Sequence, residues 1–268
     1  MNKPLSFADQ LFGLHGEVAA LVGGAGRIGK ALARALSAVG AKVAIVDVDE
    51  NAAQSLVAQI RQSGAQAIAV PADATRAEQL AEAVERITRE LGPPAMLVNT
   101  AQFRGDGFYS SNVEDYARSA WDKVIETNLT AVHLACQVFG RSMIANGGGR
   151  MVNLASTYGV VSPDPRIYGD SGVNSPVSYA AAKAGVIQLT RYLAIHWRER
   201  NIRVNCLVPG GVFDGQSADF TANYSARTPL GRMAAPEDYQ GAVIFMLSKA
   251  SNYMSGAVVT VDGGWTAW

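Results

Sequence analysis

The stretch that decides the fold lies near the start of the chain, at residues 17–29, and its sequence is EVAALVGGAGRIG. Its first six residues form a short apolar run, as expected for a parallel strand that is buried on both faces. A glycine-rich turn over 23–29 follows, and apolar side chains then recur at helical spacing as far as Val39. Strand, glycine turn and helix are the parts of a nucleotide-binding βα unit, because the turn lets the backbone approach a pyrophosphate and the helix N-terminus attracts its charge. A glycine-rich turn by itself is also compatible with an ordinary tight turn.

The alternation of strand and helix patterns continues to the end of the chain. Further strands are expected over residues 42–46, 65–70, 95–98, 151–155, 202–208 and 257–261. Alternation at this spacing predicts an α/β protein with a parallel sheet covered by helices on both faces. Right-handed crossovers then place the carboxyl ends of these strands along one edge of the sheet, where ligands bind.

Four segments between these strands have patterns of their own. Residues 113–146 are expected to form one long helix, which Gly147, Gly148 and Gly149 end. Residues 102–111 and 162–172 are rich in polar residues and turn formers, so both are expected to be loops. Residues 212–227 have weak periodicity, and we expect a mobile lobe there.

A carboxylate follows the second expected strand. Asp47 comes directly after residues 42–46, close to the separation of about 20 residues at which an acidic group meets the adenosine ribose in dinucleotide sites. A carboxylate at this place accepts hydrogen bonds from the ribose diol and repels a 2′-phosphate, so NAD is favoured over NADP. The alternative is that Asp47 caps the helix that begins near Asp49.

A tyrosine and a lysine form the candidate acid/base pair. Tyr179 and Lys183 lie in the run SYAAAK at residues 178–183, and their spacing places them on one face of a helix, about one turn apart. A free phenol titrates near pH ~10, and a neighbouring ammonium lowers its pKa toward the range useful for proton transfer. The alternative is an exposed tyrosine beside a solvated lysine.

The composition argues against several other classes of protein. The 268 residues are 49% hydrophobic and 17% charged with a formal net charge of zero, so no basic surface for nucleic acid is indicated. Cys136 and Cys206 lie far apart in apolar surroundings, as expected for buried free thiols, and the histidines lack the spacing of a metal site. The first residues lack the pattern of a signal peptide, and no apolar run approaches the ~20 residues that span a bilayer. We therefore expect a cytoplasmic protein with no nucleic-acid, membrane or metal partner.

The ordered set of motifs resembles the short-chain dehydrogenase/reductase family over essentially the whole chain. The motifs are the glycine turn, Asp73, Asn99, Asn128, Ser156, Tyr179 with Lys183, Pro209-Gly210 and Val261-Asp262-Gly263-Gly264. The resemblance implies a single domain over residues 1–268, a seven-stranded, doubly wound Rossmann sheet, and an NAD(P)-dependent oxidoreductase. It implies a catalytic set of Asn128, Ser156, Tyr179 and Lys183. The cofactor contacts that it implies are Gly23, Arg27, Ile28, Gly29, Asp47, Asp73, Ala74, Asn99, Ala101, Tyr179, Lys183, Pro209 and Val212.

In such an enzyme Tyr179 exchanges a proton with the carbonyl or alcohol oxygen of the substrate, and Ser156 hydrogen-bonds that oxygen. Lys183 lowers the pKa of the tyrosine and holds the nicotinamide ribose, and Asn128 anchors a water that relays protons to solvent. By the same resemblance the protein is a homotetramer or homodimer, joined through the long helix, the Tyr179 helix and the last strand. Trp265 and Trp268 near the end of the chain look exposed, which fits burial in a partner, but they could equally fold back on their own subunit.

Several positions depart from the family pattern. Val22 and Arg27 stand where a threonine and a glycine are usual, and Gly26 can supply the missing backbone freedom. Gln102 replaces a glycine, and Asp214 stands where a threonine often contacts the cofactor carboxamide.

The interval between Ser156 and Tyr179 is longer than usual, so the loop beside the substrate is enlarged. The sequence of this loop, with residues 209–216, resembles members associated with bacterial surface-sugar and flagellin-glycan modification. This likeness implies a polar, sugar-like or acidic-sugar substrate. Arg104 or Arg166 could meet a carboxylate or phosphate, or both could be solvated loop residues.

Two other functions remain open. The first is a reductase of 3-oxoacyl thioesters, against which Asp47 and the polar loop argue, because that reaction usually draws on NADPH and an apolar channel. The second, from a different class, is a dinucleotide-binding scaffold or sensor without turnover. Such proteins commonly lose the tyrosine or the lysine, and this chain keeps both.

Overall fold

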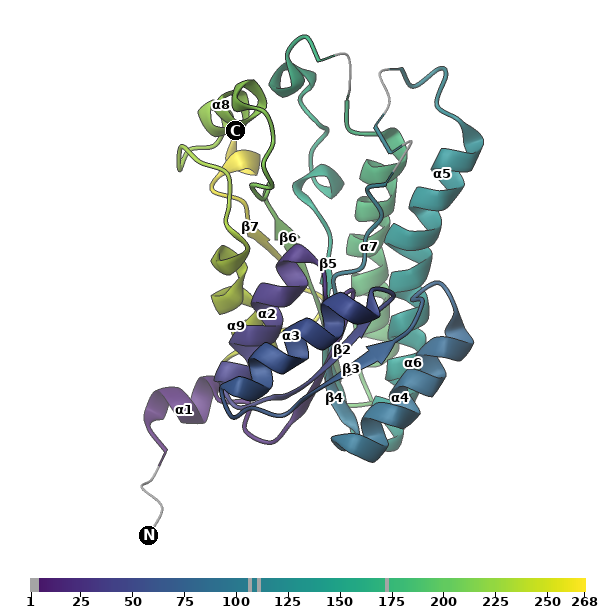
Figure 1. The fold of residues 1–268 in the computed structure, drawn as a ribbon, viewed down its shortest axis with the longest axis vertical. Coiled ribbons are helices and arrows are strands. Elements are labelled where there is room, and N and C mark those ends of the chain that lie inside the picture. The colour runs from purple at the N-terminus through teal and green to yellow at the C-terminus, as the bar shows by residue number, and fades with distance from the viewer. Residues whose placement is uncertain (1–4, 106–107, 110–111, 172–173) are drawn as a thin grey trace.

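Seven parallel strands form one sheet, and its strand order places the cleft (Figure 1). The computed structural model describes residues 5–105, 108–109, 112–171 and 174–268. The strands are β1 (Val18–Val22), β2 (Lys42–Asp47), β3 (Ala67–Pro71), β4 (Pro94–Asn99), β5 (Gly149–Leu154), β6 (Ile202–Pro209) and β7 (Val258–Val261), in the order β3-β2-β1-β4-β5-β6-β7. The order reverses between β1 and β4, so a crevice opens at the carboxyl ends of these two strands. The doubly wound sheet predicted from the sequence is confirmed.

Helices cover both faces of the sheet, as Figure 1 shows. One apolar core joins the sheet to α4 (Ala77–Glu90), α6 (Ala131–Ala145) and α7 (Val177–His196). The other joins it to α2 (Arg27–Ala38), α3 (Glu50–Gln62) and α9 (Gln240–Leu247). Every residue of β1 is buried, which is why its sequence is continuously apolar rather than alternating. Both thiols, Cys136 and Cys206, are free and buried, as expected.

The prediction of one long helix over residues 113–146 is wrong at the start and in the middle of that range. The helical segment begins at Arg118 with α5 (Arg118–Ile125), widens to a π-helical segment over Glu126–Thr130, and continues as α6. Within the π segment the Asn128 amide nitrogen donates to the carbonyl of Val124 at 3.0 Å. A side chain that bonds to the helix backbone is a recognised cause of such widening. The helix ends at Ala145, and Gly149 is already the first residue of β5.

The segment expected to be a mobile lobe contains a helix instead. This helix, α8 (Ala218–Arg227), is capped by Ser217, and its Tyr224 packs in a small core with Ile167, Met233 and Trp265. Of the two outcomes expected for Trp265, the structure has the second: the side chain folds back on its own subunit, is only 1% exposed, and stacks on Tyr224 with ring centres 4.3 Å apart. The periodicity of α8 is weak because its buried contacts come from loops rather than from the sheet.

A short helix that the sequence patterns did not indicate, α1 (Phe7–Phe12), begins at a capping box formed by Ser6 and Asp9. Of the two expected loops, residues 106–107 and 110–111 in the first and Gly172 in the second lie outside the described residues. No helix of the described part is long and apolar enough to cross a membrane.

Candidate active site

A cleft of about 890 Å³ lies at the carboxyl edge of the sheet. The structure brings almost all of the predicted site residues into it. Those that line the cleft are Gly23, Arg27, Ile28, Gly29, Asp47, Asp73, Ala74, Ala101, Ser156, Tyr179, Lys183, Pro209 and Val212. Asn99 and Asn128 are the two that do not.

The glycine turn is held tightly against the loop that follows β4. Gly23 has a φ of +77°, and a Cβ atom there would lie 2.5 Å from the backbone nitrogen of Ala101. The hydroxyl of Thr100 donates to the carbonyls of Val22 and Gly23, at 3.0 and 2.8 Å. Only glycine fits this combination of conformation and close approach. The threonine that the family usually has where Val22 stands is thus matched by a threonine directly after the neighbouring strand, β4.

The N-terminus of α2 faces the cleft without a side-chain cap. Its N-cap residue, Gly26, makes no capping hydrogen bond, and the two following residues also line the cleft. The first amides of a helix that lack partners form an anion site, which the helix dipole strengthens. A dinucleotide pyrophosphate therefore fits the residues present at this turn.

Asp47 has a fixed position at the end of β2. One carboxylate oxygen accepts from the amide of Ala25 at 2.8 Å, and the other accepts from the amide of Asp49 at 3.1 Å. The cap of α3 is Asp49, whose carboxylate accepts from the amide of Ala52 at 2.9 Å. Asp49, and not Asp47, is therefore the N-cap of α3. Asp47 presents its carboxylate to the cleft.

Asn99 lies in the interior of the sheet. Its side chain is 1% exposed and donates to Asn153 at 2.8 Å and to the thiol of Cys136 at 3.4 Å. Asn153 in turn donates to the hydroxyl of Thr190 on α7 at 3.0 Å. This side chain joins β4, β5 and two helices from within the fold, and it does not reach the cleft where the sequence predicts a cofactor contact.

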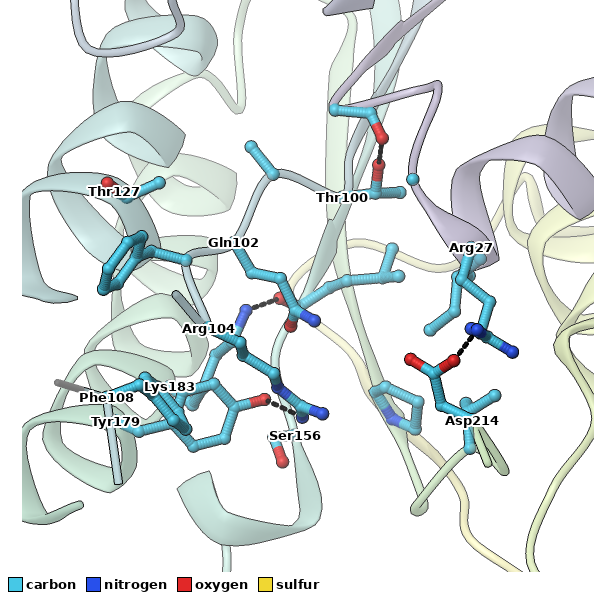
Figure 2. Close-up of a pocket in the computed structure, with 18 of the residues that line it drawn as sticks. Arg27, Thr100, Gln102, Arg104, Phe108, Thr127, Ser156, Tyr179, Lys183 and Asp214 are labelled. Atoms are coloured by element: carbon cyan, nitrogen blue, oxygen red, sulfur yellow. Dashed lines mark hydrogen bonds and ion pairs between the residues drawn. The ribbon is translucent and has the colours of Figure 1, made fainter. Parts of the chain in front are cut away.

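Tyr179 and Lys183 lie together on the buried face of α7, as their spacing predicts. They are 3% and 2% exposed, and the lysine nitrogen lies 5.7 Å from the centre of the tyrosine ring. That nitrogen donates to the carbonyl of Leu154 at the end of β5 at 2.9 Å. Ser156 follows two residues later and accepts from the amide of Tyr158 at 3.2 Å. The strand end and the helix thus bring three of the predicted catalytic side chains to one side of the cleft (Figure 2).

Asn128 is fully buried in the π-helical segment and does not line the cleft. Its amide nitrogen is fixed by Val124 and, at 3.5 Å, by the carbonyl of Phe103. Its side-chain oxygen is buried and has no hydrogen-bond partner among the described residues. Buried acceptors of this kind are usually satisfied by ordered water, so the position fits the water anchor implied by the family resemblance.

A second cation, Arg104, contacts the tyrosine. Its guanidinium donates to the phenol oxygen of Tyr179 at 3.3 Å and lies 5.4 Å from the centre of the ring, and Figure 2 shows it pointing at that hydroxyl. The Phe108 ring packs edge-on against the same tyrosine, with ring centres 5.5 Å apart. The sequence marks Arg104 only as a possible substrate contact. No periodic pattern links a loop residue to a helix so distant along the chain.

The electrostatics of the cleft favour proton exchange at Tyr179. Burial raises the pKa of this phenol, but the guanidinium of Arg104 and then the ammonium of Lys183 outweigh that effect, with help from hydrogen bonds to Arg104 and Ser156. The resulting pKa is lowered to about 8. Burial also lowers the pKa of Lys183, although the neighbouring phenol opposes the shift. A phenol with this pKa can act as both acid and base near neutrality.

The departures at Arg27 and Asp214 form one interaction. The two side chains are ion-paired across the cleft from Tyr179, and Arg27 also donates to the carbonyl of Phe213 at 3.2 Å (Figure 2). Arg166, in contrast, is paired with Asp164, remains 83% exposed, and does not line the cleft. Of the two arginines suggested as substrate contacts, only Arg104 lies in the site.

Comparison with known proteins finds similarity over nearly the whole chain. A family model described as "Enoyl-(Acyl carrier protein) reductase" matches residues 23–266. The chain is 35% identical to 2-(S)-hydroxypropyl-CoM dehydrogenase 3 of Xanthobacter autotrophicus, over 95% of this chain and 98% of that protein.

Two solved structures are similar in fold and sequence. One is a gluconate 5-dehydrogenase from Burkholderia cenocepacia in complex with NADP and tartrate, with a TM-score of 0.86 and 29% identity over 96% of this chain and 99% of that one. The other is a short-chain dehydrogenase from Leptospira borgpetersenii with bound NAD+, with a TM-score of 0.83 and 32% identity over 99% of this chain and 98% of that one.

Proposed function

The chain belongs to the short-chain dehydrogenase/reductase family and is an NAD(P)-dependent oxidoreductase acting on a small molecule, and we propose on this premise that Tyr179 is its acid/base. The observation that carries the assignment is the burial of Tyr179 beside Lys183 and Arg104 at the carboxyl edge of the sheet. Tyr179 gives a proton to the reacting oxygen during ketone reduction and takes one from it during alcohol oxidation.

The other proposed catalytic residues support that proton exchange. Ser156 hydrogen-bonds the reacting oxygen from the end of β5. Lys183 keeps the pKa of Tyr179 low and holds the ribose next to the nicotinamide. Asn128 anchors a water through its unpartnered side-chain oxygen and connects Lys183 with solvent. The bound nicotinamide supplies the hydride exchange with the substrate carbon.

We propose NAD as the preferred cofactor. The carboxylate of Asp47 stands at the end of β2, where it can accept from the ribose diol and repel a 2′-phosphate. Arg27, the arginine of the glycine turn, is already paired with Asp214. Since the two similar structures hold NADP and NAD+ respectively, the proposal rests on Asp47 and not on the comparisons.

The proposed substrate is a polar, sugar-like secondary alcohol or the matching ketone. Several hydroxyl-bearing residues line the cleft, among them Thr127, Tyr158, Tyr168 and Ser175. Among the similar proteins, gluconate 5-dehydrogenase carries a sugar acid in its name. The family-model description keeps a 3-oxoacyl-thioester reductase as the second candidate.

For the protein as a whole we propose one NAD(P)-binding domain over residues 1–268, a cytoplasmic location and a homotetramer or homodimer. The same sheet carries all of the proposed cofactor-binding segments, which supports a single domain. A dinucleotide-binding scaffold without turnover is the remaining alternative.

One experiment separates these functions. Purified protein is assayed with NAD and NADP in parallel on polyols, sugar acids, simple secondary alcohols and acetoacetyl thioester. We expect turnover with a polar alcohol or ketone and higher kcat/KM with NAD. Tyr179→Phe should lower kcat by about 10²- to 10⁴-fold and leave NADH binding in place. Preferential reduction of the thioester would support the second candidate, and binding of NADH without turnover of any compound would support the scaffold.

A further inference from the structure

Among the cationic side chains of the described residues that line the cleft, Arg104 is the one that neither interacts with a carboxylate nor is fixed to a backbone carbonyl. Four cationic side chains of the described residues line the cleft. Arg27 is paired with Asp214, Lys123 lies over the Phe103 ring and acts on the carboxylate of Asp73, and Lys183 is held by the Leu154 carbonyl. Arg104 has no ion pair with any described residue, and its contacts are with the neutral phenol of Tyr179.

The distance from Arg104 to the reacting centre limits where a ligand anion can lie. The guanidinium nitrogen is 3.3 Å from the Tyr179 oxygen. A substrate oxygen that exchanges a proton with this tyrosine must lie about 2.8 Å from it, so that oxygen is within about 6 Å of the guanidinium. A carboxylate whose carbon is bonded to the reacting carbon, or is separated from it by one carbon, falls within this span.

The chemistry of the guanidinium matches such a group. An arginine presents two parallel N–H donors to a carboxylate and keeps its charge at every relevant pH. The residue lines the cleft and is exposed to solvent, so an incoming anion can reach it. Exchanging a bond to a neutral phenol for a bidentate bond to a carboxylate strengthens the interaction and leaves Tyr179 free to bond to the substrate.

We propose that Arg104 is a specificity-determining residue that pairs with a substrate carboxylate one or two carbons from the reacting carbon. The substrate class is then 2- or 3-hydroxy acids and the corresponding oxo acids. In the oxidative direction the carbinol carbon loses a hydride to NAD+, its hydroxyl proton goes to Tyr179, and an oxo acid and NADH are formed. This inference rests on the proposed oxidoreductase function and narrows its substrate.

The test uses substrate pairs that differ only in the carboxylate. Lactate is compared with 1,2-propanediol, 3-hydroxybutyrate with 1,3-butanediol, and tartrate with threitol. Arg104→Gln removes the charge, Arg104→Lys keeps the charge without the planar fork, and Arg166→Gln is the control, because Arg166 lies outside the cleft. We expect the wild type to prefer the acid in kcat/KM for at least one pair.

Arg104→Gln should then lower kcat/KM for the acid about 10- to 100-fold more than for the diol, as expected for loss of a charged hydrogen bond. Arg104→Lys should recover part of that preference, and Arg166→Gln should retain all of it. A wild type that prefers the diol in every pair that reacts, or an Arg104→Gln variant that lowers both members equally, would overturn the inference.

A binding measurement decides the case if none of these compounds is turned over. Oxamate carries a carboxylate next to a carbonyl that cannot be reduced, and its binding to the enzyme–NADH complex is followed by NADH fluorescence. Binding that weakens at least about tenfold in Arg104→Gln but not in Arg166→Gln would support the inference. NADH binding combined with absent or Arg104-independent oxamate binding would overturn it, whereas failure to bind NADH would contradict the proposed function itself.

Discussion

Tyr179 lies between two positive side chains of different origin. Lys183 is one helical turn further along α7, and the spacing of the two residues alone places them on the same face. Arg104 belongs to a loop 75 residues earlier in the chain and donates to the phenol oxygen. Both cations favour the phenolate over the phenol, so the pKa of this one residue depends on two segments of the chain.

The first prediction concerns the pH dependence of the reaction. Alcohol oxidation needs the phenolate as base, so its kcat/KM should rise with pH through about 8, the lowered pKa of Tyr179. Ketone reduction needs the phenol and should fall over the same range. Removing a neighbouring cation, in Arg104→Gln or Lys183→Met, raises this pKa and should move both limbs to higher pH. The measurement is kcat/KM in both directions from about pH 6 to about pH 10.

Arg166→Gln serves as the control for that series, because its guanidinium is paired with Asp164 outside the cleft. Its profile should coincide with that of the wild type. Identical limbs in the wild type, Arg104→Gln and Lys183→Met would contradict the assignment of the titrating group to Tyr179.

The second prediction concerns cofactor choice at Asp47. In Asp47→Asn one oxygen remains to accept a backbone N–H, but the negative charge that repels a 2′-phosphate is lost. The ratio of kcat/KM with NAD to kcat/KM with NADP should therefore fall by about tenfold or more. Asp49→Asn is the matched control, since Asp49 caps α3 and keeps this role as asparagine. An unchanged ratio in Asp47→Asn would remove Asp47 as the determinant.

At the scale of elements, the two sides of the cofactor cleft are joined by one ion pair. Arg27 begins α2, and Asp214 lies in the segment that leads from β6 to α8. Both residues depart from the family pattern, and their contact explains why they occur together. Their side chains are 49% and 55% exposed, so the pair contributes at most about 1 kcal/mol to stability. Its position across the cleft suggests an effect on cofactor exchange.

The third prediction tests this effect. Asp214→Asn should increase the dissociation rate of NADH by a few-fold at low salt, because a contact that closes the cleft is removed, and should change the free energy of unfolding by less than about 1 kcal/mol. Stopped-flow fluorescence gives the rate, and a cycle with Arg27→Gln isolates the pair. High salt should raise the wild-type rate toward that of the variant. Equal rates in both proteins at low salt would rule out a role for the pair in cofactor exchange.

At the scale of the whole molecule, one face of α7 turns away from the sheet. Tyr192 and Ile195 are 64% and 68% exposed there, although the opposite face of the same helix carries the buried Tyr179 and Lys183. Large apolar side chains that stand together on an exposed helix are typical of an interface between subunits. Their location agrees with the proposed assembly through the Tyr179 helix.

The fourth prediction concerns that assembly. Wild-type protein should have the molar mass of a dimer or tetramer in light scattering coupled to gel filtration, and Ile195→Glu should reduce it, because a carboxylate would be buried without a partner. Phe7→Glu is the control, since Phe7 is 76% exposed on α1, outside the proposed interface. A wild-type mass of one chain, or an assembly that Ile195→Glu leaves unchanged, would contradict the proposal.

Local patterns predict the elements that pack on the sheet far better than those that pack on loops. The buried strands carry continuous apolar runs. The first and last residue of each strand lie within a few residues of the predicted bounds. Residues 113–146 and 212–227 were mispredicted for different physical reasons. Asn128 interrupts a regular helix from inside, and α8 buries Tyr224 against Trp265, a contact that no periodicity along residues 212–227 records.

The sequence by itself determined the alternating fold, the glycine turn, and the pairing of Tyr179 with Lys183, because strand burial and helical spacing act over a few residues and leave a periodic trace. Only the tertiary structure decided that Arg104 contacts Tyr179, that Arg27 pairs with Asp214, and that Asn99 faces the core. These contacts join segments far apart in the chain. Their geometry is set by how the loops leave the sheet, which no local pattern encodes.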